Sequence, residues 1–392
     1  MNATPGFRQS NGTLQRRREL QPGAGLLCGA TLTGETAMKA RERPCESAMT
    51  RIGNGLGLCI CLVALVASGL GGLSNAQSTL VLVGSGSSVP APLFSRWTQE
   101  YGKRKPNIQM RYLTLGTSEG IKQISHGAGD FAAGEAQLTE QERRVGSLIE
   151  MPVMLIAIVP VYNLPDVVPD LRLSGAVLAE IFLGDLKMWN ASQIAKLNPD
   201  ISLPNLPIQV VNRPAGKGSN YVFTDFLSRA SSRFRGQIGV TPSPKWPVGV
   251  PAERSSDMAD KVRNTPGAIG YVEYQYAEKA RITHAAVQNS AGKFVKASTD
   301  GVIAACRAAE APNWKRFSAS LIDTSGADSF PITSFSWIYV RTKTADSLRS
   351  AALRDLLDWI YTNGQQYVSQ EGYAELPPQL LAALKDKVKD LQ

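Results

Sequence analysis

Cysteine and histidine are both scarce in this sequence. Of the five cysteines among 392 residues, only Cys306 lies beyond position 61. Beyond that position no internal disulfide can form, and we expect Cys306 to be a small buried residue on an amphipathic helix. His126 and His284 are the only histidines. Without a cysteine pair they do not make a zinc site, so we expect no metal and no cofactor.

Runs of like charge are also missing. The chain has 42 Lys and Arg against 33 Asp and Glu, a formal net charge of +9. The first 76 residues hold 8 basic and 4 acidic side chains, which leaves about +5 for the rest. A mildly basic chain without a basic cluster does not indicate nucleic-acid binding, and we expect no nucleic-acid partner.

One long apolar run, LGLCICLVALVASGLGGL, occupies residues 56–73. It follows Arg51 and ends in the small residues SNA, an arrangement typical of a secretory signal peptide. A membrane anchor is the alternative, but glycines dilute the run and no basic stop-transfer cluster follows it. A lipid anchor would need a cysteine at the end of the run, whereas both of its cysteines lie in the first half.

This apolar run divides the chain. We expect residues 49–76 to be a signal peptide that is cleaved after Ala76 and exports the protein to the periplasm. Residues 1–48 are rich in Arg, Gly and Thr without a period, and we interpret them as an over-extended start or a non-core extension. The remaining 316 residues are enough for two domains with cores of their own.

Short apolar runs alternate with helical patterns from Thr79 onward. Strand-like runs include TLVLVG, IQMRYLTL, MLIAIVPVYN, PIQVV, AIGYVEY and FSWIYV, and helical patterns include PLFSRWTQEYGK, EGIKQISH, YVFTDFLSRA and SLRSAALRDLLDWIYTNG. This alternation predicts an α/β protein in which helices cover mostly parallel sheets. We expect two lobes, with the segments near 151–162 and 274–282 crossing between them. No repeat of fixed period is visible, which excludes a solenoid.

Three loops share one pattern, in which an apolar strand is followed by Gly, Ser or Thr and then by a helix. They are VGSGSSVPAP at 83–92, LGTSEGIKQI at 115–124 and RPAGKGSNYVF at 213–223. Glycine lets the backbone approach a ligand, hydroxyls donate hydrogen bonds, and the free N–H groups of a helix N-terminus attract an anion. Ordinary helix capping would use the same residues. The occurrence of three such loops favours an anion site.

Two enzyme interpretations compete for these loops. PAGKGSN resembles half of a phosphate-binding P-loop, but that motif needs Gly at 211 and Ser or Thr at 218, where this chain has Val211 and Gly218. The stretch GTSEG places Ser118 in a G-x-S-x-G pattern between a strand and a helix, which is typical of a secreted serine hydrolase, and His284 follows in the right order. No HGGG-type oxyanion loop accompanies it, and we expect the protein not to be an enzyme.

The longer motifs carry a family resemblance. GSGSSVPAPLFSRW, GTSEGIKQI, DFAAGEAQLT, IFLGDLKMWNASQIAKLNP, RPAGKGSNYVFTDFL, KWPVG and PGAIGYVEYQYA occur in this order. Together they resemble the secreted phosphate-binding proteins of ABC transporters, the PstS type, from about Thr79 to the C-terminus. The resemblance implies a two-lobed type II periplasmic-binding-protein fold that closes on its ligand by a hinge motion.

The resemblance also implies an organisation and partners. Lobe 1 would comprise residues 77–160 and 278–392, and lobe 2 would comprise residues 161–277. The ligand would be inorganic phosphate, bound by a monomer in the cleft between the lobes and delivered to the permease subunits of an ABC-type importer. A phosphate sensor or scavenger that works without a transporter is an alternative that the chain does not separate from this one.

Carried over position by position, the family's ligand contacts fall on the three loops and on the residue after DFAAG. They are Ser88, the backbone of Val89, Thr117, Glu135, Arg213, Lys217, Gly218 and Ser219. By the same mapping Ser118 is a helix-start residue and not a nucleophile. The chain departs from the family's usual Asp at Glu135, Asp at Ala215 and Ser at Lys217, so one carboxylate is lost and one ammonium is gained. It also has Val89 where the family usually has Phe, and Ser88 where Thr is usual.

Glu135 is the most informative of these residues. A carboxylate repels a bound anion unless it accepts a proton from that anion, and phosphate carries such a proton near neutral pH whereas sulfate does not. The carboxylate would therefore reject a fully deprotonated anion. The alternative is that Glu135 only pairs with Lys217 or caps a turn.

Overall fold

The structure is a computed structural model that describes residues 79–167, 170–309 and 319–391. The described residues belong to one compact unit. The extension expected at 1–48 lies outside the described residues, as does the signal peptide expected at 49–76. Within the described ranges, no helix combines the length and the apolar character that a membrane crossing needs.

The strands follow the apolar runs of the sequence. In chain order they are β1 (Leu80–Gly86), β2 (Ile108–Thr114), β3 (Phe131–Gly134), β4 (Leu148–Tyr162), β5 (Arg172–Leu173), β6 (Gln209–Asn212), β7 (Val250–Pro251), β8 (Ala268–Glu273), β9 (Ala286–Gln288), β10 (Phe294–Val295) and β11 (Thr333–Arg341). An eight-stranded sheet has the order β2-β1-β3-β11-β4-β8-β6-β7, and a smaller sheet has the order β10-β9-β5.

The helices occupy the amphipathic segments between the strands. They are α1 (Ala91–Arg104), α2 (Thr117–Ser125), α3 (Glu140–Val145), α4 (Gly175–Leu183), α5 (Ser192–Ala195), α6 (Gly218–Ala230), α7 (Ser232–Gln237), α8 (Ser255–Asn264), α9 (Tyr274–Ala280), α10 (Thr299–Ala308), α11 (Ser347–Trp359), α12 (Gln366–Gln370) and α13 (Pro378–Lys389), with a π-helical turn at Ile360–Gly364. The predicted α/β alternation is confirmed.

Two parallel sets of strands are joined through two long strands. β1 pairs in parallel with β2 and β3, and β6 pairs in parallel with β7 and β8. β11 lies antiparallel to β3 and β4, and the second half of β4 lies antiparallel to β8. β4 has 15 residues and is long enough to pair with β11 along one part and with β8 along another. The two parallel sets of strands are therefore parts of one continuous sheet.

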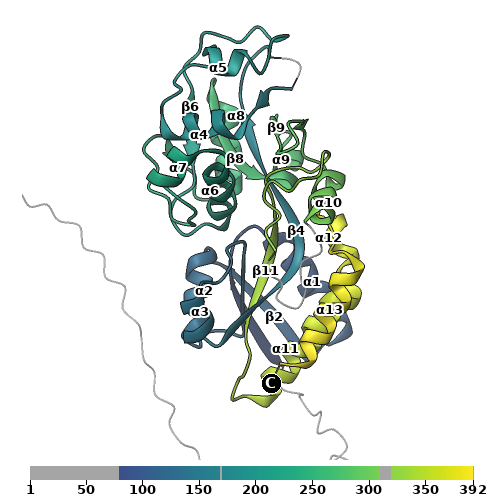
Figure 1. Cartoon of the computed structure of the whole chain (residues 1–392). Helices are drawn as coiled ribbons and strands as arrows, with labels where there is room; N and C mark the ends of the chain where they lie inside the picture. The colour runs from purple at the N-terminus through teal and green to yellow at the C-terminus, as the bar shows by residue number, and fades with distance from the viewer. Residues whose placement is uncertain (1–78, 168–169, 310–318, 392) are drawn as a thin grey trace, which may run out of the picture. The chain divides into compact units, whose positions relative to one another are not determined.

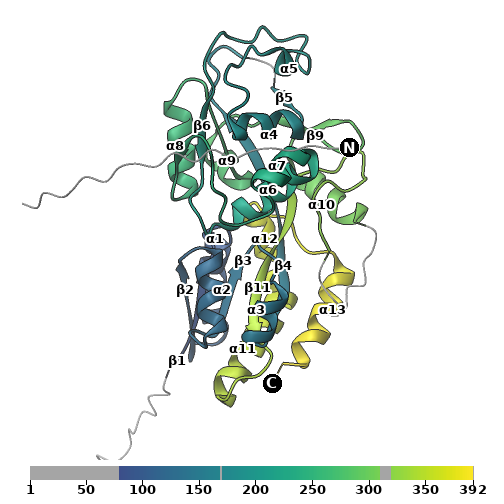
Figure 2. The ribbon, with the colours of Figure 1, turned by 60° about the vertical axis from the view of Figure 1, so that its left-hand side comes forward.

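The elements gather around the two ends of β4 (Figures 1 and 2). β1–β3, α1–α3, α11 and α13 surround one end, and β6, β8 and α4–α8 surround the other. We keep the division into lobes as a proposal, with one refinement. Because β9 pairs with β5, we propose that the chain returns to the first lobe in the segment that leads into β11, later than residue 278.

The expectation for Cys306 is met. Cys306 lies on α10 and is 2% exposed, and burial raises the pKa of its thiol to about 11. Trp97 and Trp189 are fully buried, and Trp359 is nearly so. His126 is exposed at the C-terminal end of α2.

Candidate functional site

The three loops singled out in the sequence meet at one cavity of about 410 Å³. The segments that line it lie mostly at the carboxyl ends of parallel strands, where open α/β sheets bind ligands. They are residues 87–89 and 91 after β1, 114 and 116 at the end of β2, 213 and 217–219 after β6, 253–256 after β7, and 276 on α9. Of the predicted contact residues, the wall includes Ser88, Val89, Arg213, Lys217, Gly218 and Ser219, whereas Thr117 and Glu135 are not part of it.

The first loop is shaped by a close backbone approach. Gly86 ends β1 with a φ of 140°, and a Cβ at this position would collide with the carbonyl of Ala133. The Ser87 hydroxyl accepts a hydrogen bond of 3.1 Å from the Val89 N–H, and the Val89 carbonyl accepts one of 2.6 Å from Tyr373. The structure thus caps the Val89 N–H locally and leaves the Ser88 side chain half-buried at the cavity.

The second loop contacts the third across the cavity. Gly116 precedes α2 with a φ of 95°, and no side chain caps the helix there. Its first residue, Thr117, is fully buried and donates a hydrogen bond of 3.3 Å to Glu135. The Ser118 N–H donates a hydrogen bond of 3.2 Å to the Gly216 carbonyl, which joins the helix start of one lobe to the loop of the other.

The third loop holds Arg213 by its backbone. Tyr271 accepts a hydrogen bond of 3.1 Å from the Arg213 N–H, and Trp246 donates one of 3.2 Å to the Arg213 carbonyl. The side chain is 2% exposed, and its Nε makes no hydrogen bond with a described residue. The buried hydroxyl of Ser219 likewise has no partner among them. Buried donors without a protein partner are costly, and an oxyanion would satisfy both.

Glycine is required where α6 begins. Lys217 is the N-cap residue of α6, and its side chain does not cap the helix. A Cβ on Gly218 would collide with Oε2 of Glu135, so this carboxylate lies directly behind the N-terminus of α6. Free N–H groups at such a terminus carry a partial positive charge that attracts anions.

Glu135 is fully buried at the end of β3. It accepts hydrogen bonds from Thr117 at 3.3 Å and from Ser336 at 3.1 Å. Burial raises the pKa of Glu135 to about 7, the carboxylate of Glu273 adds to that rise, and the surrounding hydroxyls, Ser87 foremost, oppose it. A carboxyl group with this pKa exchanges its proton near neutral pH, where phosphate does the same.

The structure does not join Lys217 to Glu135. Its Nζ lies 3.3 Å from Glu253, which lines the same cavity. The idea that Lys217 offsets Glu135 by pairing with it is therefore wrong for this structure, because the lysine side chain extends along the cavity rim while Glu135 lies behind Gly218.

The hydrolase pattern is not assembled. Ser118 lies within the first turn of α2. His284 is buried, bridges to Val161 on β4 and has its Nε2 3.3 Å from Glu278. No hydrogen bond between Ser118 and His284 is found in the described part of the chain, and Ser118 therefore lacks the neighbouring base that would activate it.

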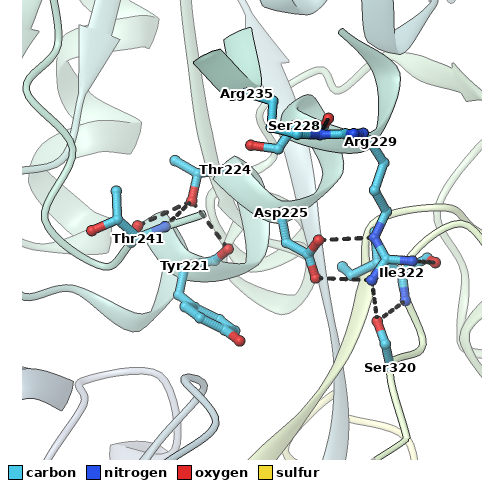
Figure 3. A network of polar contacts seen from close by, with 9 residues as sticks. All are labelled: Tyr221, Thr224, Asp225, Ser228, Arg229, Arg235, Thr241, Ser320 and Ile322. Atoms are coloured by element: carbon cyan, nitrogen blue, oxygen red, sulfur yellow. Dashed lines mark hydrogen bonds and ion pairs between the residues drawn. The ribbon is translucent and has the colours of Figure 1, made fainter. Parts of the chain in front are cut away.

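Polar contacts around α6 hold the helix that carries the third loop (Figure 3). Thr224 donates a hydrogen bond of 3.0 Å to the Thr241 carbonyl. Asp225 pairs with Arg229 at 2.8 Å, and Arg229 donates a hydrogen bond of 3.0 Å to Ser320. Ser320 lies on the segment that leads to β11, so this network ties α6 to that segment.

Sequence reasoning missed several residues that shape the site. Asn220 accepts a hydrogen bond from the Tyr271 hydroxyl and donates one of 2.7 Å to the Pro214 carbonyl. Trp246 and Ser336 contact Arg213 and Glu135, respectively. Asn220 and Tyr271 stand inside the quoted motifs RPAGKGSN and PGAIGYVEY, which was the available signal. Ser336 lies in an ordinary strand and gave none.

Residues 73–363 match the family described as a PBP superfamily domain. The chain is 33% identical to the phosphate-binding protein PstS of Xylella fastidiosa (strain 9a5c), over 77% of this chain and 83% of that protein. It is also 33% identical to the phosphate-binding protein PstS of Haemophilus influenzae, over 82% of this chain and 96% of that protein. The crystal structure of a phosphate binding protein from Stenotrophomonas maltophilia has a TM-score of 0.58 at 17% identity, and the match covers 79% of this chain and 94% of that chain. That likeness supports the fold.

Proposed function

The chain belongs to the PstS phosphate-binding proteins of the PBP superfamily, and we propose that it captures inorganic phosphate between its lobes and delivers it to an ABC-type importer. The observation that carries this proposal is the cavity at which three strand-to-helix loops meet around the buried Nε of Arg213, which has no hydrogen-bond partner among the described residues. It acts as a binding protein and not as an enzyme.

Each group of the cleft has a part in capture. The guanidinium of Arg213 offers two parallel N–H donors to two oxygens of the anion. The hydroxyls of Ser88 and Ser219, with the free N–H groups at the start of α6, supply further donors. Thr117 holds Glu135, which accepts the proton that distinguishes phosphate from sulfate. β4 and β11 join the two lobes, so closure by bending at these strands brings the loops together.

Cellular context follows from the same proposal. A signal peptide at residues 49–76, cleaved after Ala76, would release the protein into the periplasm. A monomer would then present closed, loaded lobes to the permease subunits of the importer. Neighbouring genes for a permease and an ATPase would support this role over that of a sensor or scavenger.

Calorimetry of residues 77–392 tests the function. We expect one phosphate per chain, arsenate bound at the same site because it has the same shape and protonation, and sulfate and molybdate rejected. If titration with phosphate and with arsenate gives no heat, and neither anion competes with the other, the proposed phosphate-binding function is wrong.

Lys217→Ser should weaken phosphate binding less than about tenfold. The ion pair of Lys217 with Glu253 is partly exposed and contributes about 0 to 1 kcal/mol, and the backbone N–H groups at the start of α6 survive the substitution. Titration calorimetry beside Lys245→Ser, a change at an exposed lysine outside the cavity lining, measures the difference. If Lys217→Ser alone lowers the affinity for phosphate by 100-fold or more, the Lys217 ammonium instead contacts the anion directly.

A further inference from the structure

The N-terminus of α8 lies in the cavity wall but has no assigned part in capture. α8 begins at Ser255, shortly after β7, and residues 253–256 line the cavity. The N-cap residue is Arg254, whose side chain does not cap the helix, because an arginine side chain offers no hydrogen-bond acceptor. The first N–H groups of this ten-residue helix therefore carry the partial positive charge that attracts an oxyanion.

Ser255 supplies a second, independent indication of a ligand. The residue is 2% exposed, it lines the cavity, and its hydroxyl has no hydrogen-bond partner among the described residues. Ser219, at the start of α6, is likewise buried in the cavity wall with a hydroxyl that lacks a partner in the described ranges. A buried hydroxyl without a partner is costly, and an oxygen atom of a ligand would satisfy it.

The carboxylates beside the start of α8 are already paired with cations. Oε2 of Glu253 lies 3.3 Å from Nζ of Lys217. Oδ1 of Asp257 lies 3.1 Å from the guanidinium of Arg254, and the Arg254 N–H donates a hydrogen bond of 3.1 Å to Oδ2. A cation next to each carboxylate reduces the repulsion that the carboxylate exerts on a bound anion.

The starts of α6 and α8 lie at the same edge of the sheet. β6 and β7 are parallel neighbours with Asn212 opposite Pro251, and the Ala252 N–H donates a hydrogen bond of 2.8 Å to the Asn212 carbonyl. α6 follows β6 in the chain, and α8 follows β7. The carboxyl ends of two adjacent strands therefore present both helix starts to one cavity.

The two helices approach this edge from opposite faces of the sheet. Phe223 of α6 stacks on Tyr271 of β8, with the ring centroids 4.2 Å apart. A Cβ on the preceding residue, Gly270, would instead collide with the sulfur of Met258 on α8. Successive residues of a strand face opposite sides of the sheet. The sheet therefore separates the donor groups of α6 from those of α8.

The cavity has room for an oxyanion at each helix start. Its volume of about 410 Å³ falls in the range of about 300 to 1,000 Å³ that is typical of sites for small organic ligands, so one phosphate ion leaves part of it unfilled. Both helices pack on β8, and a hinge motion of the lobes therefore leaves the spacing of the two helix starts unchanged. Closure does not carry a phosphate from the start of α6 to Ser255.

We propose that Ser255 and the start of α8 form a second oxyanion position in the cleft, and that the cleft therefore also binds diphosphate. One phosphate group would lie at Arg213 and the start of α6, and the other at Ser255. The proposal rests on the proposed phosphate-binding function and adds a class of ligand to it. Two linked phosphate groups fit this arrangement because the donors stand in two separate groups around one cavity, whereas a single phosphate engages only the first group.

Competition calorimetry with inorganic phosphate and inorganic diphosphate tests the proposal. Diphosphate should bind to the wild-type protein with one molecule per chain and should displace phosphate. Ser255→Ala should weaken diphosphate binding about tenfold or more, which is the effect of losing a hydrogen bond to a charged group, and should leave the affinity for phosphate within about twofold. Ser255→Thr keeps the hydroxyl and should retain diphosphate binding. Titration with a nucleoside diphosphate distinguishes an esterified diphosphate from a free one as the ligand.

Ser228→Ala is the matched control. Ser228 on α6 is also buried, with a hydroxyl that has no partner among the described residues, but it does not line the cavity, and its substitution should change neither affinity. The proposal is wrong if diphosphate does not displace phosphate from the wild type, or if Ser255→Ala weakens the binding of both anions equally or of neither. If the wild type binds neither anion, the proposed phosphate-binding function itself fails, which is a different result from phosphate binding without diphosphate binding.

Discussion

Arg213→Ala weakens phosphate binding by about 2 to 5 kcal/mol, or roughly 30- to 5,000-fold. This is the range for truncating one partner of a buried charged pair, and Arg213 is 2% exposed with its Nε free of protein partners in the described part of the chain. Because a lysine ammonium cannot reproduce two parallel N–H donors, Arg213→Lys should also bind clearly worse than the wild type. Titration calorimetry with phosphate measures both variants.

Two controls separate lost contact from lost structure. Arg235→Ala removes an exposed arginine of α7, the Nε of which donates a hydrogen bond of 2.8 Å to the Ser228 carbonyl. This variant should keep the wild-type affinity for phosphate within about threefold. The thermal unfolding of Arg213→Ala should remain cooperative, because backbone groups make the hydrogen bonds of residue 213 with Tyr271 and Trp246. If both Arg213 variants bind phosphate with wild-type affinity, Arg213 does not contact the anion.

Glu135→Gln should admit sulfate. In the wild type, a deprotonated anion faces an acceptor-only carboxylate, and juxtaposed like charges cost several kcal/mol. An amide can turn its N–H toward a deprotonated oxygen, so sulfate binding should improve at least about 100-fold relative to phosphate. Competition titrations with sulfate and phosphate at two pH values measure the ratio. Equal rejection of sulfate by wild type and variant would rule out the proton-acceptor role.

Glu150→Gln is the matched control for this variant. Glu150 is also buried, but its partners are the Leu138 N–H at 2.6 Å and Arg143 at 2.7 Å, neither of which lines the cavity. Its substitution should cost stability without changing anion discrimination.

The Glu135→Gln variant should also have a flatter pH profile of stability without ligand. The pKa of Glu135 rises from 4.5 in a free side chain to about 7 in the folded protein. A raised carboxyl pKa contributes to the free energy of unfolding, and this contribution is fully present below pH 4.5 and is lost as the pH rises through 7. The contribution amounts to at most about 3 kcal/mol. Urea unfolding of wild type and variant at both ends of this range isolates the contribution. Parallel profiles would contradict the raised pKa.

The local pattern of the chain determined the elements and the loops. Short apolar runs specify β1, β2 and β6 because a strand that is buried in a sheet needs apolar side chains on the faces that it hides from water. The glycines and hydroxyls at 83–92, 115–124 and 213–223 identify the anion loops because strand, turn and helix start are adjacent in sequence. The family motifs add Glu135, which no local pattern marks as special.

Only the tertiary structure decided which partner each buried group has. Ser336 donates a hydrogen bond to Glu135 from 201 residues away, and Lys217 pairs with Glu253 and not with Glu135. The physical reason is that hydrogen bonds, burial and pKa shifts depend on neighbours in space, and sheet pairing brings together residues whose separation along the chain carries no pattern.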